Sequence, residues 1–275
     1  MTSILPFRYP GGKYYALPKL RPFWMNQYHQ EYREPFVGGG AVFFDKASSQ
    51  KSWINDLDEE LIITYRILQN EELREKLEFD LRNEDPSKER WNYFYREFKP
   101  KDEFEVAKRY FYLNRVSFSG KLQSAAYGYR PKRSVPPSRW KEKIFPAGEK
   151  LKNVKITNFD FEEVIRESSE LETLMFIDPP YFNPAKNKHY RKGFNYEDHC
   201  RLENCLRESK HKFFLTYEAD PDIKKMYKWA NIYELKFTYR VGDSNQNSSK
   251  RTTGNEIIIT NYQLKNEENI QYELI

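Results

Sequence analysis

The sequence has few of the residues that covalent cross-links and metal sites require. It contains only two cysteines, Cys200 and Cys205, and only four histidines, which are scattered along the chain. The spacing of the two cysteines within an expected helix is poor for metal binding, so we interpret them as reduced structural thiols. The composition therefore predicts neither a disulfide scaffold nor a bound metal.

Long apolar runs are also missing. No stretch approaches the roughly 18 consecutive apolar residues that a membrane-spanning helix needs. The first residues, MTSILPFRYPGGK, lack the charged and then apolar pattern of a signal peptide. These absences predict a soluble, cytoplasmic protein with no membrane partner.

Charge is distributed unevenly along the chain. The formal net charge is +5 overall, whereas residues 86–155 carry 18 Lys and Arg against 7 Asp and Glu. A basic block in an otherwise acidic chain suits a polyanionic partner, because contacts with phosphates dominate nucleic-acid affinity. A solvated charged surface explains the block equally well. Aromatic residues interleave with Arg and Lys at 109–118 and 127–133, which suits stacking on bases.

The pattern of apolar residues predicts an α/β domain that is interrupted once. Strands are expected at 32–37, 53–56, 154–156, 174–177, 212–216, 232–239 and 256–262. Helices are expected at 14–30, 41–48, 57–68, 104–115 and 198–207. Loops are expected at 118–140, which is rich in Gly and Pro, and at 240–254, which is polar. We therefore expect a core domain from residues 1–59 and 154–275, interrupted by a basic, mainly helical insert at 60–153.

A glycine turn follows the first expected strand, in the EPFVGGG segment at 34–40. Such a turn between a strand and a helix lets the backbone approach a ligand closely. Its pattern differs from the dinucleotide fingerprint GxGxxG, which argues against a nicotinamide dehydrogenase. Asp56 ends the next strand, where a carboxylate can hold ribose hydroxyls. The turn alone is explained equally well as structural, but together with Asp56 it favours a ligand that contains adenosine.

The strongest signal is the DPPY segment at 178–181, directly after the apolar LMFI strand. Ligands of open α/β sheets bind outside the carboxyl ends of the strands. Because the two prolines have no N–H donors, their carbonyls and the Asp178 carboxylate present only acceptors, which suits an exocyclic amine. Tyr181 supplies a flat face on which a base can stack. A proline turn capped by a carboxylate is the structural alternative, and it leaves Tyr181 unexplained.

The RYPGGK segment at 8–13 places an aromatic ring and a cation, Tyr9 and Lys13, on either side of a glycine pair. Taken alone, it is better explained as a solvated turn. In order, however, RYPGGK, EPFVGGG, NDLD and DPPY, with an insert before the last, resemble the Dam-like alpha group of N6-adenine-specific DNA methyltransferases. Three more segments are similar to the LNR…F(N/S)G, NxDF and closing-strand segments of that family, namely FYLNRVSFSG at 111–120, NFDF at 158–161 and EIIITNY at 256–262.

The resemblance covers nearly the whole chain. It implies the class I fold of methyltransferases that use S-adenosylmethionine (SAM), which is a Rossmann-like, mixed seven-stranded sheet, with the insert recognising a target in double-stranded DNA. The residues implied at the SAM site are Tyr9, Lys13, Phe36, Gly38, Gly40, Asp56, Asp160, Phe161 and Asp178.

Roles follow from the resemblance for the residues nearest the chemistry. Asp56 would hold the ribose hydroxyls, and Asp160 would face the amino edge of the SAM adenine with Phe161 on its ring. Asp178 and the Pro179 carbonyl would accept hydrogen bonds from the target amine, and Tyr181 would stack on the target base.

The target amine is a poor nucleophile because its lone pair is delocalised into the adenine ring. Two acceptors around its N–H groups favour a pyramidal nitrogen, so direct displacement on a methyl donor needs no covalent enzyme intermediate. A base inside a duplex cannot reach such a pocket, so we expect the adenine to be flipped out.

The expected DNA contacts are Arg115, Lys121, Gln123, Tyr127, Arg130, Lys132, Arg133 and Arg139 in the insert, and Lys188, Arg191 and Lys192 after DPPY.

Alternatives to this function stay open at the level of the sequence. One is methylation of RNA adenine or of the N4 amine of cytosine, and another is a DNA-binding homologue without catalysis. The recognition sequence is also open, as is the biological setting, which is solitary, phage-borne or paired with a restriction endonuclease that acts on the same site. The resemblance implies a monomer.

Overall fold

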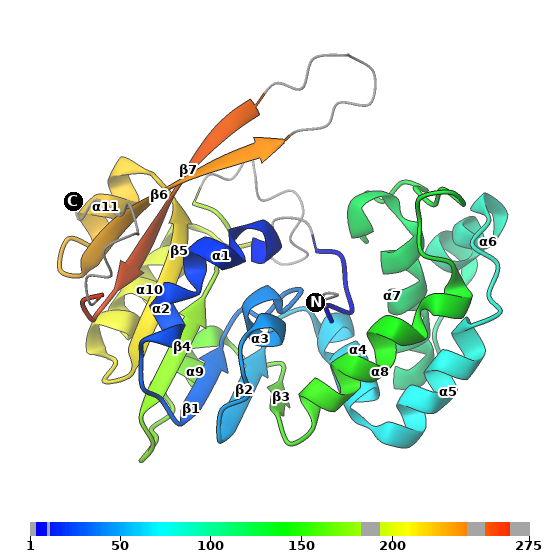
Figure 1. The fold of residues 1–275 in the computed structure, drawn as a ribbon, viewed down its shortest axis with the longest axis horizontal. Helices are drawn as coiled ribbons and strands as arrows, with labels where there is room; N and C mark the ends of the chain where they lie inside the picture. The colour runs from blue at the N-terminus through cyan, green and yellow to red at the C-terminus, as the bar shows by residue number, and fades with distance from the viewer. Residues whose placement is uncertain (1–3, 10–11, 183–192, 241–250, 265–275) are drawn as a thin grey trace.

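One mixed sheet organises the chain in the computed structural model, which describes residues 4–9, 12–182, 193–240 and 251–264, with backbone alone at 236–240 and 251–255 (Figure 1). The strands are β1 Glu31–Glu34, β2 Lys51–Asn55, β3 Lys155–Thr157, β4 Thr173–Ile177, β5 Lys212–Glu218, β6 Asn231–Arg240 and β7 Arg251–Thr260. Their order is β3-β2-β1-β4-β5-β7-β6. β7 is antiparallel to β5 and β6, whereas the other neighbours are parallel. The expected class I fold, a Rossmann-like mixed seven-stranded sheet, is confirmed.

The central strand β4 is buried along its whole length. It lies between β1 and β5 and parallel to both, so both of its edges are paired, and its buried side chains show that neither face reaches water. Leu174 and Phe176 face one apolar layer, and Met175 and Ile177 face the other. Burial on both faces explains why the strand is a continuous apolar run in the sequence. Its carboxyl end delivers Asp178 to the edge at which β1 and β5 also end.

Helices cover both faces of the sheet (Figure 1). One face is covered by η1 Lys13–Ala16, α1 Leu17–Leu20, α2 Pro22–Met25 and α3 Ala41–Asp45. The other is covered by α9 Phe161–Arg166, α10 Tyr196–Glu208 and α11 Pro221–Met226. Among the described residues, no helix combines the length and the apolarity that crossing a bilayer would require.

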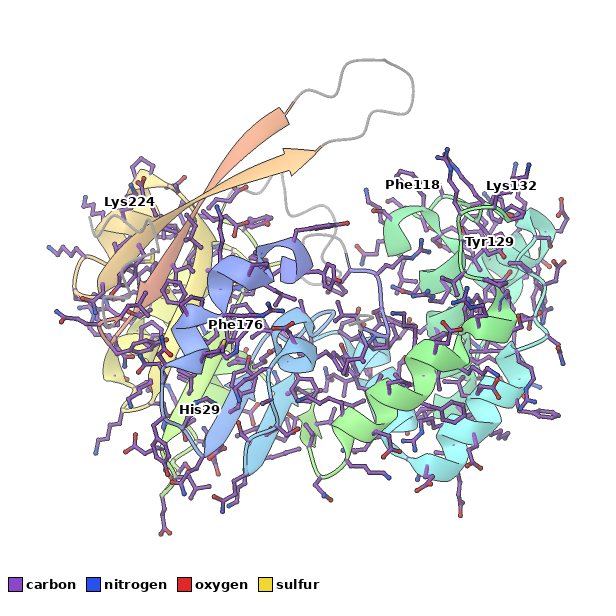
Figure 2. The ribbon with its side chains drawn as sticks, in the orientation of Figure 1. His29, Phe118, Tyr129, Lys132, Phe176 and Lys224 are labelled. Carbon is purple, nitrogen blue, oxygen red and sulfur yellow. The ribbon has the colours of Figure 1, made fainter. Side chains whose placement is uncertain are left out.

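Between β2 and β3 the chain is mainly helical. The helices are α4 Glu59–Gln69, α5 Glu71–Leu81, α6 Lys88–Asn92, η2 Tyr93–Glu97, α7 Glu103–Val116, η3 Phe118–Gly120, η4 Pro137–Arg139 and α8 Lys141–Leu151. Their buried side chains belong to the same apolar cluster as the strands beside them. Phe118, Tyr129 and Lys132 lie near one another at one end of this helical region (Figure 2). The division at 60 and 153 stays a prediction.

Helix α8 and the segment at 240–254 are among the elements that differ from expectation. The sequence analysis predicts no element over α8, although Ile144, Ala147 and Leu151 form a buried face at helical spacing and the helix contains Pro146. Of the polar segment expected as a loop at 240–254, Arg240 and residues 251–254 instead belong to strands, because β6 and β7 pair up to Arg240 and Arg251; residues 241–250 lie outside the described residues. The backbone hydrogen bonds of these strands need no apolar side chains, so the sequence pattern does not reveal them.

Candidate active site

Three adjacent strands place polar side chains at one corner of the sheet. Asp178 follows β4, Thr216 lies in β5 and Glu256 lies in β7. Thr216 Oγ1 donates to Asp178 Oδ1 at 2.7 Å. Lys13 Nζ also lies 2.7 Å from Asp178 Oδ1, and it is 3.9 Å from Glu256 Oε1. A buried ammonium group therefore bridges two carboxylates at the carboxyl edge of the sheet.

Lys13 remains charged in this buried position. Burial lowers the pKa of Lys13, but attraction to Asp178 and then to Glu256 outweighs it, so the pKa is raised well above its usual value. Lys13 Nζ also lies 5.4 Å from the centre of the Tyr181 ring, within the range of a cation–π contact. Burial raises the pKa of Tyr181 to about 12, so its phenol stays neutral. Sequence reasoning assigned Lys13 to SAM; the structure pairs it with Asp178.

The glycine turn and Asp56 form a second cluster beside this corner. Gly38 N donates to Asp56 Oδ2 at 2.8 Å, and Asp58 N donates to Oδ1 at 2.9 Å. Burial raises the pKa of Asp56 to about 6, although these N–H groups act against it. Gly40 has a φ of +68°, and a Cβ there would lie 2.9 Å from the Phe44 ring, so the turn requires glycine.

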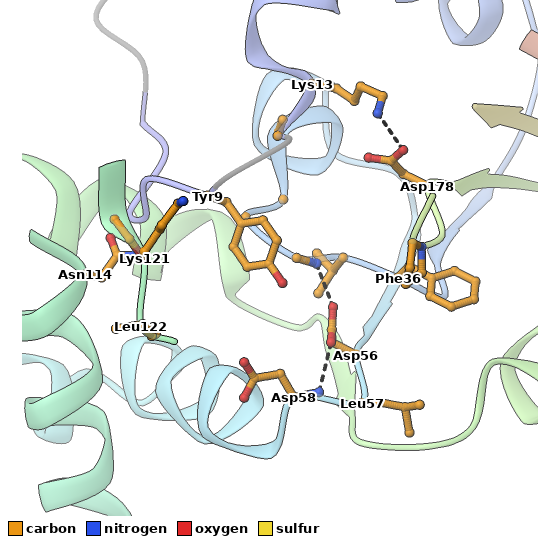
Figure 3. Close-up of a pocket in the computed structure, with 18 of the residues that line it drawn as sticks. Tyr9, Lys13, Phe36, Asp56, Leu57, Asp58, Asn114, Lys121, Leu122 and Asp178 are labelled. Carbon is orange, nitrogen blue, oxygen red and sulfur yellow. Dashed lines mark hydrogen bonds and ion pairs between the residues drawn. The ribbon is translucent and has the colours of Figure 1, made fainter. Parts of the chain in front are cut away.

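One pocket joins the two clusters (Figure 3). The predicted SAM-site residues that line it are Tyr9, Lys13, Phe36, Gly38, Gly40, Asp56 and Asp178. Lys121 and Gln123, predicted as DNA contacts, line the same pocket. Sequence reasoning missed Tyr110, Leu122, Phe176 and Phe194, whereas Asp58 and Pro180 line the pocket from within the NDLD and DPPY segments. Asn114 and Gly120 also line it, and their only sequence signal is their place in the FYLNRVSFSG segment.

Arg8 joins the N-terminal segment to the end of α7. Arg8 N donates to Asn114 Oδ1 at 3.0 Å, and Asn114 Nδ2 donates back to Arg8 O at 2.8 Å. Arg8 Nη2 donates to the carbonyls of Asn114, Arg115 and Ser117 at the helix end. Gly120 has a φ of +72°, and a Cβ there would collide with the Arg8 carbonyl. Through these contacts the helical region forms a wall of the pocket, opposite Asp178 (Figure 3).

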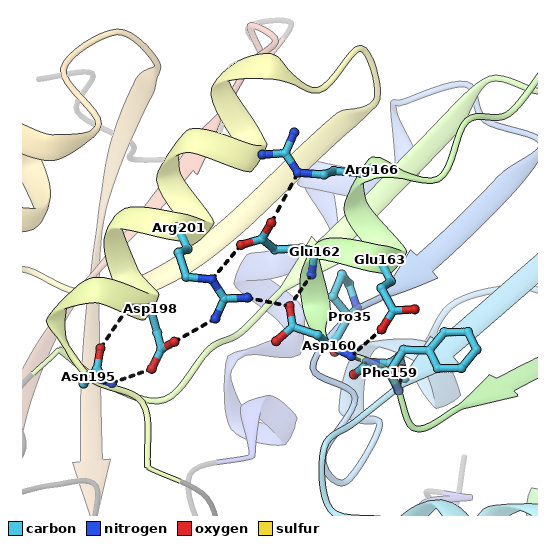
Figure 4. A network of polar contacts seen from close by, with 10 residues as sticks. Pro35, Phe159, Asp160, Glu162, Glu163, Arg166, Asn195, Asp198 and Arg201 are labelled. Carbon is cyan, nitrogen blue, oxygen red and sulfur yellow. Dashed lines mark hydrogen bonds and ion pairs between the residues drawn. The ribbon is translucent and has the colours of Figure 1, made fainter.

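Asp160 and Phe161 are not among the described residues that line the pocket. Asp160 caps α9, with Glu162 N donating to its Oδ1 at 2.9 Å, and it accepts from Arg201 Nη2 at 2.9 Å (Figure 4). The Arg201 guanidinium lies 4.9 Å from the centre of the Phe161 ring. Phe161 is buried and stacks on Phe36, which does line the pocket. The contacts predicted between these residues and the SAM adenine stay predictions.

The described pocket lining likewise includes Pro180 but neither Pro179 nor Tyr181. Pro179 is buried, and the Tyr181 ring lies beside Lys13 Nζ. Asp178 is therefore the one residue of the predicted catalytic set that lines the pocket.

Arg115, a predicted DNA contact, lies largely inside the protein. It is only 9% exposed, and burial together with the neighbouring Arg8 lowers its pKa to about 10. A side chain buried in this way does not offer its charge to a phosphate or a base edge, which argues against the predicted DNA contact. The sequence places Arg115 beside other basic and aromatic residues, but α7 turns it inward.

The other predicted DNA contacts fall into three groups. Arg130, Lys132, Arg133 and Arg139 are exposed, and Arg139 also pairs with Glu142 at 2.7 Å. Tyr127 is half-buried and donates its hydroxyl to the Pro86 carbonyl at 2.9 Å. Lys188, Arg191 and Lys192 lie outside the described residues.

Comparisons with known proteins agree with this architecture. Residues 9–241 match the family model of the D12 class N6 adenine-specific DNA methyltransferases. The chain is 33% identical to Type II methyltransferase M1.LlaDCHI of Lactococcus lactis subsp. cremoris, covering 94% of this chain and 96% of that protein. It is 27% identical to Type II methyltransferase M.CviBI of Paramecium bursaria Chlorella virus NC1A, with coverages of 83% and 88%.

A third relative is Type II methyltransferase M.MjaIII of Methanocaldococcus jannaschii, which is 29% identical over 94% of this chain and 100% of that protein. The family match spans most of the chain and includes the glycine turn, Asp56, the helical region and Asp178. On this evidence the chain belongs to the D12 class N6 adenine-specific DNA methyltransferase family.

Proposed function

We propose that this protein transfers a methyl group from SAM to the N6 amine of a flipped-out adenine at a specific site in double-stranded DNA. Membership of the family and the class I sheet support SAM as the methyl donor. The observation that carries the proposal is that the glycine turn at 38–40, Asp56 and Asp178 line one pocket. A site for the donor and an acceptor for an amine thus lie within reach of each other.

The described residues fit SAM. Asp56 offers a carboxylate at the end of β2, where ribose hydroxyls can donate to it. The turn at 38–40 presents backbone without side chains, and Phe36, Leu57 and Phe194 provide apolar walls for an adenine ring. SAM supplies a methyl group made electrophilic by its sulfonium.

Asp178 and the Pro179 carbonyl are the proposed acceptors for the two N–H groups of the target amine. They orient the nitrogen lone pair toward the methyl donor, and such positioning supplies up to roughly 7–11 kcal/mol of barrier reduction in well-aligned reactions. Lys13 Nζ lies 2.7 Å from one oxygen of Asp178, and the carboxylate would also stabilise the positive charge that develops on the target nitrogen. Tyr181 is the proposed stacking face, and stacking contributes roughly 1–3 kcal/mol per base.

The insert at 60–153 is the proposed target-recognition unit. The support is that Arg130, Lys132 and Arg133 are exposed and that Phe118 is 58% exposed. Figure 2 shows Lys132 and Phe118 at the same end of the helical region. Cations of this kind contact phosphates, and Arg also reads guanine edges in the major groove. The motif order further supports a place in the Dam-like alpha group.

The Type II relatives support a role in restriction–modification. A monomer is proposed to methylate the site that a partner restriction endonuclease would otherwise cut. Mapping methylated positions in the DNA of a methylation-free expression host would identify that site.

The proposal is tested by incubating the purified protein with SAM and either duplex DNA or RNA, followed by mass spectrometry of the nucleosides. We expect N6-methyldeoxyadenosine from duplex DNA alone. N4-methyldeoxycytidine or methylated RNA adenosine would replace the proposal with one of the alternative substrates. DNA binding without methylation would indicate a homologue that has lost catalysis.

A further inference from the structure

We propose that Thr216 is a positioning residue of the methyl-transfer site. Its hydroxyl and Lys13 together engage one carboxylate oxygen of Asp178, Oδ1, and thereby turn the other oxygen, Oδ2, toward the target amine. This inference rests on the proposed function of Asp178 as the acceptor, and it adds a residue that no motif identifies.

The sheet brings Thr216 to Asp178 by register. Ile177 pairs with Leu215 in the parallel ladder between β4 and β5, so Asp178 and Thr216 occupy the next positions on neighbouring strands. Side chains alternate along a strand, so both face the same side as Phe176 and Phe214, whose rings stack with centroids 4.8 Å apart. Thr216 is only 1% exposed, and its hydroxyl is therefore fixed by its surroundings.

In the described part of the chain, Thr216 and Lys13 both donate to the same oxygen of the Asp178 carboxylate. Thr216 Oγ1 lies 2.7 Å from Asp178 Oδ1 but 3.4 Å from the Ile177 carbonyl. A hydroxyl has one proton to donate, and the shorter bond to a charged acceptor is the stronger one. Lys13 Nζ donates to the same Oδ1 at 2.7 Å.

The second oxygen, Oδ2, is turned away from Lys13 (Figure 3). Within the residues that the structure describes, the recorded hydrogen bonds and ion pairs of Asp178 involve Oδ1 alone. An ionised carboxylate accepts on both oxygens, so Oδ2 retains the capacity that the amine requires.

Lys13 alone does not hold the carboxylate in one orientation. Rotation about the terminal bond of an Asp side chain is soft, and a flexible lysine stem can follow it. Thr216 differs because a β-branched residue in a buried strand is stiff. Its loss should therefore misalign Oδ2 while leaving the SAM pocket and the DNA surface unchanged. The expected signature is a lower kcat without a matching change in KM for SAM or DNA.

The test compares three variants in steady-state and single-turnover methylation of duplex DNA. Thr216→Val keeps the shape of the side chain but removes the donor, and we expect kcat to fall about tenfold to a hundredfold. Thr216→Ser keeps the donor and should restore most of that loss. Thr173→Val is the matched control, because Thr173 is also buried and hydrogen-bonded but lies at the opposite end of β4; it should leave kcat unchanged.

The outcomes separate this inference from the proposed function. A Thr216→Val variant with wild-type kcat would overturn the role of Thr216 and leave the proposed function intact. Equal losses in the Val and Ser variants, or in Thr173→Val, would also overturn it, because they would indicate a structural effect. A wild-type protein that does not methylate adenine would instead refute the proposed function. Thr216→Ala, which also lacks the hydroxyl, repeats the comparison if the Val variant does not fold.

Discussion

Replacing Asp56 by Asn should stabilise the protein at pH 8 while weakening its binding of SAM. Burial raises the pKa of Asp56 from 3.8 to about 6, against the effect of the Asp58 and Gly38 N–H groups. A group whose pKa is raised in the folded state contributes stability that is present below its unfolded pKa and lost as the pH rises through its folded pKa. Above pH 6 the ionised Asp56 therefore reduces stability, and the proposed contact with ribose explains why a carboxylate stands there.

The size of the effect follows from the difference between the two pKa values. Raising the pKa of Asp56 from 3.8 to about 6 corresponds to at most about 3 kcal/mol, since one pKa unit is about 1.4 kcal/mol. Partial exposure of the side chain reduces this figure through solvent screening. Asn keeps one acceptor oxygen, so the variant also loses one backbone hydrogen bond of about 1 kcal/mol. We expect a net gain of about 1 kcal/mol at pH 8, which is a few degrees in Tm.

Urea denaturation of both proteins at pH 8 and pH 4 measures this gain, and calorimetry with SAM measures the loss of affinity. The advantage of Asp56→Asn should shrink as the pH falls and disappear near pH 4, because the folded wild type is then protonated at Asp56. The electrostatic reasoning would be refuted if the variant were less stable than wild type at pH 8. It would also be refuted if the difference in unfolding free energy between variant and wild type were the same at both pH values. Unchanged SAM affinity would remove Asp56 from the proposed cofactor site.

Two further predictions concern the helical region. Gly120→Ala should destabilise the protein by about 2 kcal/mol, because the backbone at this position is left-handed and the added Cβ would collide with Arg8. The variant should also bind SAM more weakly. An unchanged Tm would contradict this prediction. The double variant Lys132→Ala, Arg133→Ala should weaken DNA binding and lower the slope of log affinity against log salt by about 1 to 2. The control is Lys210→Ala, because Lys210 is exposed and precedes β5 at the opposite edge of the sheet. An equal effect of this variant on DNA binding would mean that Lys132 and Arg133 do not form a dedicated DNA-binding surface.

The central strands of the fold were predictable from local pattern. A strand buried on both faces must be apolar throughout, so the LMFI run identified β4 and placed Asp178 at its carboxyl end. The expected helix at 57–68 agrees with α4, Glu59–Gln69, because its apolar residues recur at helical spacing. The glycine turn and Asp56 followed from the same logic, since parallel strands end at one edge.

The remaining features depend on contacts between distant segments. Nothing local distinguishes the buried Arg115 from an exposed DNA-binding arginine, because its burial depends on how α7 packs against the rest of the protein. The pairing of Lys13 with Asp178 is equally remote in the chain. In the sequence, Thr216 is indistinguishable from any other β-branched strand residue. Only the register between β4 and β5 shows that it lies beside Asp178.

The most direct test of the central claim is the rate of methyl transfer to duplex DNA by Asp178→Ala under single-turnover conditions. Asp178 is the proposed acceptor for the target amine, so we expect the rate at saturating SAM to fall about a hundredfold to a thousandfold, with DNA affinity close to that of the wild type. Circular dichroism would establish that the variant is folded. A folded Asp178→Ala protein that methylates adenine at the wild-type rate would contradict the account.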